Sequence, residues 1–308
     1  MITANQKQEV VGLLISEKQR LGSFAKVAKK VQVSDATISL MVNGQFDQVT
    51  EEMWQRVANA IGHRPEGWQV VQTTNTGIVT SAANRAKQDS LFMAIAHRAG
   101  SGKTASLRAF EATNKSQHVF YLSCREWAKR EFLVNLAQNL GIDGGNRAMS
   151  VDALLMAVVA FFKARRSYRP LLILDEADKL KSAAFRTLIT LYNECEDQLG
   201  VLIAGTDHLE KQMNSDARYN RKGSDELSSR FGRAFIHLVG ATAKDIESIC
   251  AANGLTNTTT AREIFAECEP VKRVVSINNA TRTVEVVEDL RRVKRAIQRE
   301  LARLQQAA

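Results

Sequence analysis

Residues 97–104 read HRAGSGKT and combine small, flexible residues with one lysine and one hydroxyl side chain, a set suited to binding phosphate groups. In such a loop the backbone N–H groups surround the phosphates, Lys103 reaches the outer phosphates and Thr104 binds a magnesium ion. An apolar run precedes the loop and a stretch with helical periodicity follows it, which is the order that a phosphate-binding loop requires. We therefore expect ATP and Mg²⁺ here, with the nucleotide contacted by Ala99, Gly100, Ser101, Gly102, Lys103, Thr104 and Ala105.

The first position of this loop departs from the usual pattern, because His97 stands where glycine is expected. A side chain there must be accommodated, and the start of the loop loses its most permissive residue. We expect reduced nucleotide affinity or slow turnover as a result. A chance match of GSGKT in an unrelated loop is the alternative interpretation.

A second set of chemically capable residues follows at 171–180, where LLILDEADKL places two acids directly after an apolar run. In this position Asp175 would hold Mg²⁺ through its water shell, and Glu176 would act as the general base on the attacking water. The letters DEAD also occur in a class of helicases, but one such domain with a helical tail leaves no room for their two lobes. An acidic surface turn after a buried strand is the structural alternative.

The order of these motifs along the chain resembles that of the AAA+ ATPases, over about residues 78–308. The resemblance implies that Thr206, at the end of the next apolar run, lies between the two acids and the γ-phosphate. It implies an arginine finger in DELSSRFGRAF, with Arg230 the first choice and Arg233 the second, acting on the nucleotide of a neighbouring subunit. It also implies that Arg273 touches the γ-phosphate from a helix. A solvated helix face is the alternative for the two arginines of DELSSRFGRAF.

The elements that must position these residues follow from hydrophobic periodicity. Short apolar runs at 92–96, 118–122, 171–174 and 201–204 alternate with helical stretches, which predicts an α/β fold with a parallel sheet and covering helices. We expect an AAA+ P-loop NTPase core at 80–240, a linker at 71–79 and a helical lid at 241–308. Within the lid, 271–277 could be a strand, but we favour a helix.

The helical pattern of residues 1–70 predicts a small all-α domain. In 22–46 the apolar positions favour two short helices joined by a sharp turn, and the stretch resembles the helix-turn-helix of Cro and repressor-type DNA-binding domains. The resemblance implies that the second helix presents its start to DNA; the expected contacts are Ser34, Asp35, Thr37, Ser39 and Asn43. A helical domain that packs against another protein is the alternative. Further DNA contacts are expected from Lys129, Arg130, Lys179 and Lys181.

Composition limits the class of protein. Lysine and arginine number 42 against 33 acidic residues, so the net charge of +9 permits a polyanionic partner. The longest apolar run, at 153–162, is far shorter than the roughly 20 residues that cross a bilayer. The beginning of the chain lacks the features of a secretory signal. We expect a cytoplasmic protein with no membrane partner.

The whole layout, a repressor-type helix-turn-helix followed by one compact AAA+ module and a small lid, resembles the Mu B family of phage transposition proteins. The resemblance implies a slow ATPase that binds double-stranded DNA with little sequence preference, assembles head to tail with copies of itself into filaments, and activates a transposase. The alternatives are a helicase loader or replication initiator, and a transcriptional repressor with a nucleotide-sensing module. Only the repressor is expected to occupy a single operator as a dimer.

Overall fold

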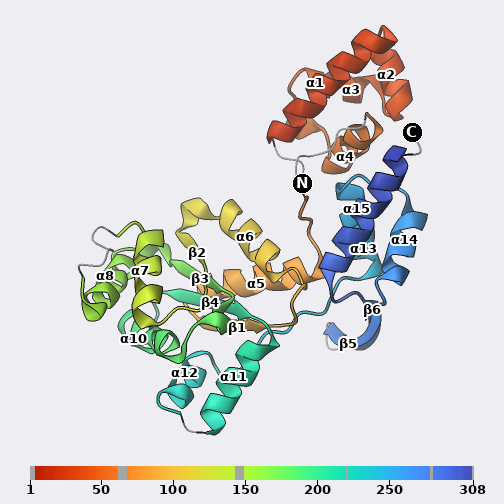
Figure 1. Cartoon of the computed structure of the whole chain (residues 1–308). Helices are drawn as coiled ribbons and strands as arrows, with labels where there is room; N and C mark the ends of the chain where they lie inside the picture. The colour runs from red at the N-terminus through yellow and green to blue at the C-terminus, as the bar shows by residue number, and fades with distance from the viewer. Residues whose placement is uncertain (1–3, 62–67, 143–148, 220, 278–279, 307–308) are drawn as a thin grey trace. The chain divides into compact units, whose positions relative to one another are not determined.

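The structure, a computed structural model, describes residues 4–61, 68–142, 149–219, 221–277 and 280–306 (Figure 1). The chain divides into two compact units, and neither is continuous in sequence. The first unit comprises Met1–Val71, Thr242–Pro270 and Arg291–Ala308, and the second comprises Gln72–Ala241 and Val271–Leu290.

The N-terminal part of the first unit is a cluster of short helices around one apolar core. Ile38, Met41 and Trp54 are fully buried in this core. Gln32 closes the second helix in the left-handed conformation (φ 56°), and the Ser34 hydroxyl caps the start of the third. The predicted pair of helices about a sharp turn is therefore present as α2 (Phe24–Val31) and α3 (Asp35–Val42). The helices are α1 (Ala4–Leu21), α2 (Phe24–Val31), α3 (Asp35–Val42) and α4 (Glu51–Ala60).

A parallel sheet forms the centre of the second unit. Its strands are β1 (Phe92–Ala96), β2 (Val119–Ser123), β3 (Leu171–Asp175) and β4 (Gly200–Gly205), in the order β1-β4-β3-β2. These strands coincide with the four predicted apolar runs to within a residue or two. The runs are mostly apolar because helices cover both faces of the sheet.

Helices cover each face of this sheet (Figure 1). Leu171 and Ile173 pack with helices α5 (Thr74–Gln88) and α6 (Lys103–Thr113). Their neighbours Leu172 and Leu174 pack into the opposite apolar cluster. That second cluster is built by helices α7 (Lys129–Asn139), α8 (Val151–Lys163), α9 (Ser182–Phe185), α10 (Thr187–Cys195), α11 (Asp207–Arg218) and α12 (Ser224–Arg230).

The start of the α/β core differs from the expectation. Residues 71–79 were expected to be a linker, but α5 begins at Thr74 within that stretch. The Thr73 hydroxyl caps the helix by accepting the backbone N–H of Thr76 at 3.2 Å. The core therefore begins before residue 80.

The predicted lid contains three helices and, unexpectedly, a β-hairpin. The helices are α13 (Ala243–Ala252), α14 (Thr258–Glu267) and α15 (Leu290–Gln306). Strands β5 (Val271–Ile277) and β6 (Ala280–Val286) pair antiparallel, so the preference for a helix at 271–277 was wrong. Valine and isoleucine favour strands because their branched side chains suit a pleated surface.

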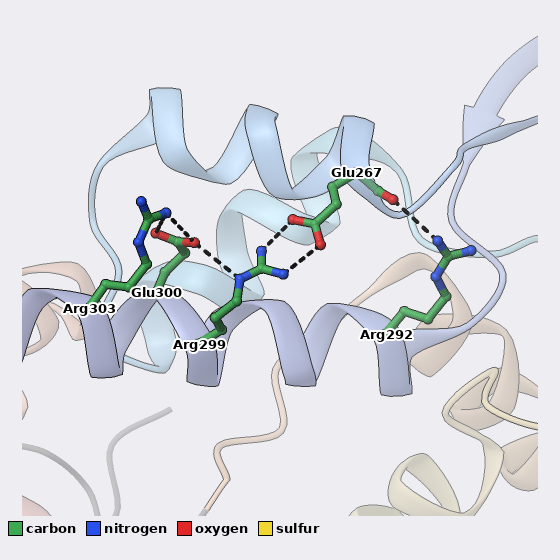
Figure 2. Close-up of polar contacts among 5 residues, drawn as sticks. All are labelled: Glu267, Arg292, Arg299, Glu300 and Arg303. Atoms are coloured by element: carbon green, nitrogen blue, oxygen red, sulfur yellow. Dashed lines mark hydrogen bonds and ion pairs between the residues drawn. The ribbon is translucent and has the colours of Figure 1, made fainter.

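Ion pairs join α14 to α15 (Figure 2). The guanidinium of Arg299 makes two contacts with the Glu267 carboxylate, at 2.8 and 2.5 Å, and Arg292 donates to the Glu267 carbonyl at 3.3 Å. Arg303 pairs with Glu300 at 3.2 Å on α15 itself. These arginines serve the packing of the helices. No helix in the described ranges combines the length and apolar character needed to cross a membrane.

Candidate active site

The chemically capable residues meet at the edge of the sheet where the parallel strands end. Strand β4 lies between β1 and β3, with Ala96 paired to Gly205 and Leu174 paired to Ile203. The phosphate-binding loop leaves β1, Asp175 ends β3 and Thr206 follows β4. In open α/β sheets this edge is where ligands bind.

The phosphate-binding loop has the backbone that its glycines predict. Gly100 and Gly102 both adopt φ +87°, a conformation that side chains rarely take. Lys103 begins α6 directly after them, so the positive end of the helix dipole faces the loop. The Lys103 ammonium donates to the carbonyls of His97, at 2.5 Å, and Arg98, at 2.9 Å. The loop thus holds its lysine against its own backbone.

His97 is accommodated without backbone strain. Its φ is not positive, so this position does not require glycine. The side chain is 7% exposed, and no partner among the described residues bonds its Nε2. Burial, reinforced by the nearby Lys103 ammonium, lowers the pKa of His97, and the imidazole is therefore neutral at neutral pH.

Asp175 is held rigidly at the end of β3. It is 1% exposed. The Tyr121 hydroxyl donates to its Oδ2 at 2.8 Å, and the backbone N–H of Glu176 donates to its Oδ1 at 2.9 Å. Burial raises the pKa of Tyr121 to about 12, so Tyr121 stays a hydrogen-bond donor. Sequence reasoning missed Tyr121, because its contact depends on which strand lies beside β3.

Glu176 has both carboxylate oxygens engaged. The Lys179 ammonium contacts Oε1 at 2.8 Å, and the Ser123 hydroxyl donates to Oε2 at 3.2 Å. The hydrogen bond from Lys179 is the largest cause that lowers the pKa of Glu176. Neither partner was foreseen, although Ser123 ends the strand beside β3 and Lys179 lies three residues along the chain.

Thr206 lies at the expected strand end, but its contacts differ from the expected ones. Its hydroxyl donates to Asp178 Oδ2 at 2.7 Å and accepts the backbone N–H of His208 at 3.3 Å. Thr206 is therefore also the N-terminal cap of α11. Among the acids of this turn, Asp178 is the one that Thr206 contacts, rather than Asp175 or Glu176.

The site has the groups that magnesium and a nucleotide require. Hydroxyl and carboxylate oxygens are the ligands that Mg²⁺ prefers, usually with several retained waters. Thr104 is exposed in the first turn of α6, and Asp175 supplies the carboxylate. Gly100 and Gly102 add no side chain of their own to the loop, although Asp289 and Leu290 lie directly against them.

Arg230 lies away from the phosphate-binding loop of its own chain. Its guanidinium is over the ring of Tyr192, at 4.8 Å, and donates to Asn193 Oδ1 at 3.0 Å. Tyr192 in turn packs edge-on against Phe92, the first residue of β1. The loop follows the other end of that strand. Arg233, the second choice, pairs with Asp225 at 2.8 Å.

Arg273 lies on strand β5 and not on the helix that was expected. It donates to Glu288 Oε1 at 2.9 Å, and Arg98 of the phosphate-binding loop contacts the other oxygen of the same carboxylate. Burial alone would raise the pKa of Glu288, but the two arginines outweigh it and hold the pKa below its ordinary value. Glu288 was not singled out in the sequence.

The segment that follows β6 packs directly on the phosphate-binding loop. The backbone N–H of Leu290 donates to the Gly100 carbonyl at 2.9 Å. A Cβ on Gly100 would lie 2.1 Å from Asp289 Oδ1, and one on Gly102 would lie 3.0 Å from Leu290 Cδ1. The glycines are therefore needed for close approach as well as for their backbone conformation.

The expected DNA-contacting residues of α3 separate into exposed and structural ones. Asp35, Ser39 and Asn43 are exposed. Ser34 is exposed but caps the helix, with its hydroxyl accepting the Thr37 N–H at 3.1 Å. Thr37 was expected to point outward, but it is 7% exposed and lies against the core. It occupies the inward face one turn before Met41.

Of the lysines and arginine of the α/β core that were expected to contact DNA, several instead contact groups of the protein itself. Lys129 lies 3.7 Å from Asp152, and Arg130 donates to the Met149 carbonyl at 2.9 Å. Lys179 contacts Glu176, as described. Lys181 is exposed.

Residues 85–213 match the family model described as an AAA domain. This part of the chain is therefore similar to an AAA domain. No curated protein was found to match the chain.

The comparison with solved structures finds proteins of low sequence identity to this chain. Cdc6p from Pyrobaculum aerophilum is 16% identical with a TM-score of 0.48, over 66% of this chain and 57% of that chain. The ORC2 protein of Aeropyrum pernix, solved as ADPNP–ADP complexes, is 15% identical with a TM-score of 0.46, over 66% and 58%. The Aeropyrum pernix ORC1 protein in complex with DNA is 13% identical with a TM-score of 0.42, over 78% and 96%. The match thus spans less than two thirds of the first two proteins.

Proposed function

We propose that this chain is an ATPase that assembles on duplex DNA in its ATP-bound form and activates a transposase there. The observation that carries the ATPase part is the convergence of Lys103, Glu176 and Thr206 at one edge of the sheet of an AAA domain. No comparison with a known protein bears on the transposase. That part rests on the resemblance of the layout to the Mu B family.

The site residues divide the work of phosphoryl transfer to water. Lys103 and the N–H groups at the start of α6 bind the phosphate charge. Thr104 and Asp175 hold Mg²⁺, which when bound neutralises charge on the transferring group. Glu176 orients the attacking water and accepts its proton. Asp175 keeps its geometry because Tyr121 and the adjacent backbone fix both of its oxygens.

The assembly part rests on Arg230. Its guanidinium lies near the beginning of β1, and the phosphate-binding loop follows the end of this strand, roughly 13 Å farther on at the usual rise per residue. Arg230 is thus placed to serve a nucleotide on a neighbouring copy after leaving Asn193. A head-to-tail contact of this kind that does not close into a ring produces a helical filament.

DNA binding rests on exposed polar residues of α3 and on cations of the α/β core such as Lys181. Each phosphate contact alone is weak. Summed over the subunits of a filament, such contacts produce firm and salt-sensitive binding with little dependence on sequence.

Electron microscopy and ATPase assays on the full chain test this proposal. With ATP, the protein is expected to coat duplex DNA of random sequence, and Lys103→Ala is expected to abolish the coating. Arg230→Ala is expected to lower hydrolysis about 10³-fold or more while each subunit still binds ATP. Mixing the two variants is expected to restore part of the activity, because an intact loop then meets an intact arginine across some interfaces.

Arg262→Ala serves as the matched control, since Arg262 is an exposed arginine paired with Glu247 in the helical unit. It is expected to behave like the unaltered protein. Equal coating of DNA with and without ATP would refute the assembly part. Protection of one operator by a dimer would favour a repressor instead, and assembly only at a defined origin with a helicase would favour a loader.

A further inference from the structure

A pocket lies between helices α9, α11 and α12 of the α/β unit, and its described lining residues include none of those placed in the nucleotide site. Helices α11 and α12 lie side by side here (Figure 1). The pocket has a volume of about 220 Å³. Its apolar lining consists of Phe185, Met213 and Leu227, whose side chains are all buried. A ligand that enters this pocket can therefore bury apolar surface.

The size of the pocket limits what can fill it. An apolar cavity of about 150 Å³ holds one benzene molecule, whereas pockets for drug-sized molecules measure about 300 Å³ or more. The pocket thus has room for one aromatic or leucine side chain, but not for a whole cofactor. Met213 suits such a site, because the flexible side chain of methionine adapts to the shape of its neighbour.

Two cations that line the pocket have no acidic partner. Arg186 and Lys222 are exposed, and neither contacts a carboxylate among the residues that the structure describes. The acids nearby in the sequence already pair with arginines: Asp216 with Arg221, Asp225 with Arg233, and Glu226 with Arg230. Arg186 and Lys222 are therefore available to a negatively charged ligand.

Contacts within the chain hold the polar side of the pocket in place. The Ser224 hydroxyl donates to the Asp216 carbonyl at 2.8 Å, which ties the segment around Lys222 to α11. A Cβ on Gly223 would lie 3.1 Å from Arg186 Cδ, so this glycine allows the aliphatic part of Arg186 to approach the same segment closely. The lining is thus built by the protein itself and needs no ligand to form.

We propose that this pocket receives one large apolar side chain from a segment of a partner protein in which acidic residues flank that side chain. The apolar side chain fills the space beside Met213, and the flanking carboxylates pair with Arg186 and Lys222. Complementary charge favours a separate acidic partner, since this chain itself carries a net charge of +9. The inference goes beyond ATP-dependent assembly on DNA, because the docking requires neither ATP nor DNA.

Fluorescence anisotropy of labelled synthetic peptides with the full chain tests this docking site, in the absence of ATP and DNA. The first probe is a short peptide of aspartate and glutamate with one central phenylalanine, and the second has alanine at the centre. The phenylalanine peptide is expected to bind at least about tenfold more tightly, which is the lower end of what burial of one such side chain contributes. A third probe, with lysines in place of the acids, is expected not to bind.

Variants of Met213 test whether the peptide recognises the space in the pocket. Met213→Phe adds volume there and is expected to erase the preference for phenylalanine over alanine. Met213→Ala enlarges the pocket and is expected to shift the preference from phenylalanine to tryptophan. A general loss of structure would weaken all peptides alike and would not produce such a shift.

Lys222→Met tests the contribution of charge. It is expected to weaken binding of the phenylalanine peptide about two- to fivefold, the range for one exposed ion pair. Lys26→Met is the matched control, because Lys26 is likewise exposed and without a carboxylate partner in the part of the chain that the structure describes, but lies on α2. The control is expected to leave binding unchanged. Equal weakening by both variants would show attraction by overall charge and would overturn the role of Lys222.

The outcomes separate this proposal from the function proposed above. The docking site is refuted if the phenylalanine and alanine peptides bind equally to the unaltered protein, or if neither binds. If neither binds and Met213→Phe abolishes the coating of DNA with ATP, the pocket belongs instead to a contact between copies of this chain. If the phenylalanine peptide binds as expected but DNA is never coated, the docking site holds and the function proposed above fails. A thermal unfolding curve for each variant shows whether weak binding reflects misfolding.

Discussion

His97 shows how one residue can break a motif while leaving its geometry intact. The loop tolerates it because its φ is not positive and because the imidazole is buried in neutral form beside Lys103. The expected obstacle to nucleotide binding therefore has no basis in the backbone. Its consequence is instead a dependence of stability on pH.

We expect stability to fall in mild acid partly through His97. Its pKa is lowered in the folded protein but is near the ordinary value of about 6.5 in the unfolded chain. As pH falls below this value the unfolded state takes up the proton first, so the free energy of unfolding decreases down to the folded-state pKa. His97→Gln removes this titration. Urea unfolding between pH 7 and pH 5 is expected to show a shallower decrease for the variant, and an identical slope would contradict the assignment.

At the same scale, the sequence singled out residues that lie at one edge of the sheet but not all of their contacts. Asp175 and Glu176 were recognisable because acids follow an apolar run. Their partners Tyr121 and Ser123 come from β2, far away in sequence, and only the strand order brings them alongside β3. Spacing alone cannot reveal a contact that depends on which strands are neighbours.

At the scale of elements, Ser34 at the start of α3 stabilises the helix itself, although it was expected to contact DNA. The Ser34 hydroxyl accepts the Thr37 N–H, which would otherwise lack a partner. Ser39 is exposed one turn farther on, near Asn43. Ser34 therefore has a structural role as the helix cap, whereas Ser39 is exposed and available for the proposed DNA contact.

Ser34→Ala is expected to lower the free energy of unfolding by about 1 kcal/mol, because the cap is lost. Ser39→Ala is expected to leave stability unchanged and to weaken DNA binding. Chemical unfolding and fluorescence anisotropy with a duplex probe measure the two effects. Equal loss of stability in both variants would show that Ser39 is also structural.

The four strands of the main sheet were predictable because each is a short, mostly apolar run, and β3 and β4 are buried at every position. The hairpin was not, because β5 mixes valines with Lys272 and Arg273 and its outer residues are exposed. Strand β6, its pairing partner, follows directly in sequence and also mixes apolar with charged and polar residues. The apolar residues of the two strands therefore show no periodicity that favours a strand over a helix. A two-stranded ribbon that is not covered by a second layer of structure does not require apolar and polar residues to alternate strictly along each strand.

At the scale of the whole molecule, the excess positive charge leads to a prediction about how the proposed DNA binding depends on salt concentration. Each lysine that neutralises a phosphate releases counterions, and the logarithm of affinity then falls linearly with the logarithm of salt concentration. Lys181→Met is expected to reduce that slope by about 1 per bound subunit and to weaken binding uniformly across DNA sequences. Binding isotherms at several salt concentrations test this. An unchanged slope would remove Lys181 from the interface.

The AAA fold was recoverable from the sequence, since its loop, acids and strand ends follow one another in a fixed order. The division of the chain was harder to predict. Residues of the helical unit come from three separate stretches, and the hairpin that belongs with the α/β unit lies between two of them. A prediction that reads the chain from one end to the other assigns contiguous domains and cannot detect such an insertion.

The packing of Asp289 and Leu290 on Gly100 and Gly102 bears on how the protein can be dissected. A fragment truncated after Ala241 would retain the phosphate-binding loop, Asp175, Glu176 and Thr206 yet lack the strap formed by 287–290, leaving bare the glycines that this strap covers. Such a fragment would be a poor surrogate for the intact protein in nucleotide titrations. Deletion studies should therefore join the two pieces of the α/β unit through a short spacer.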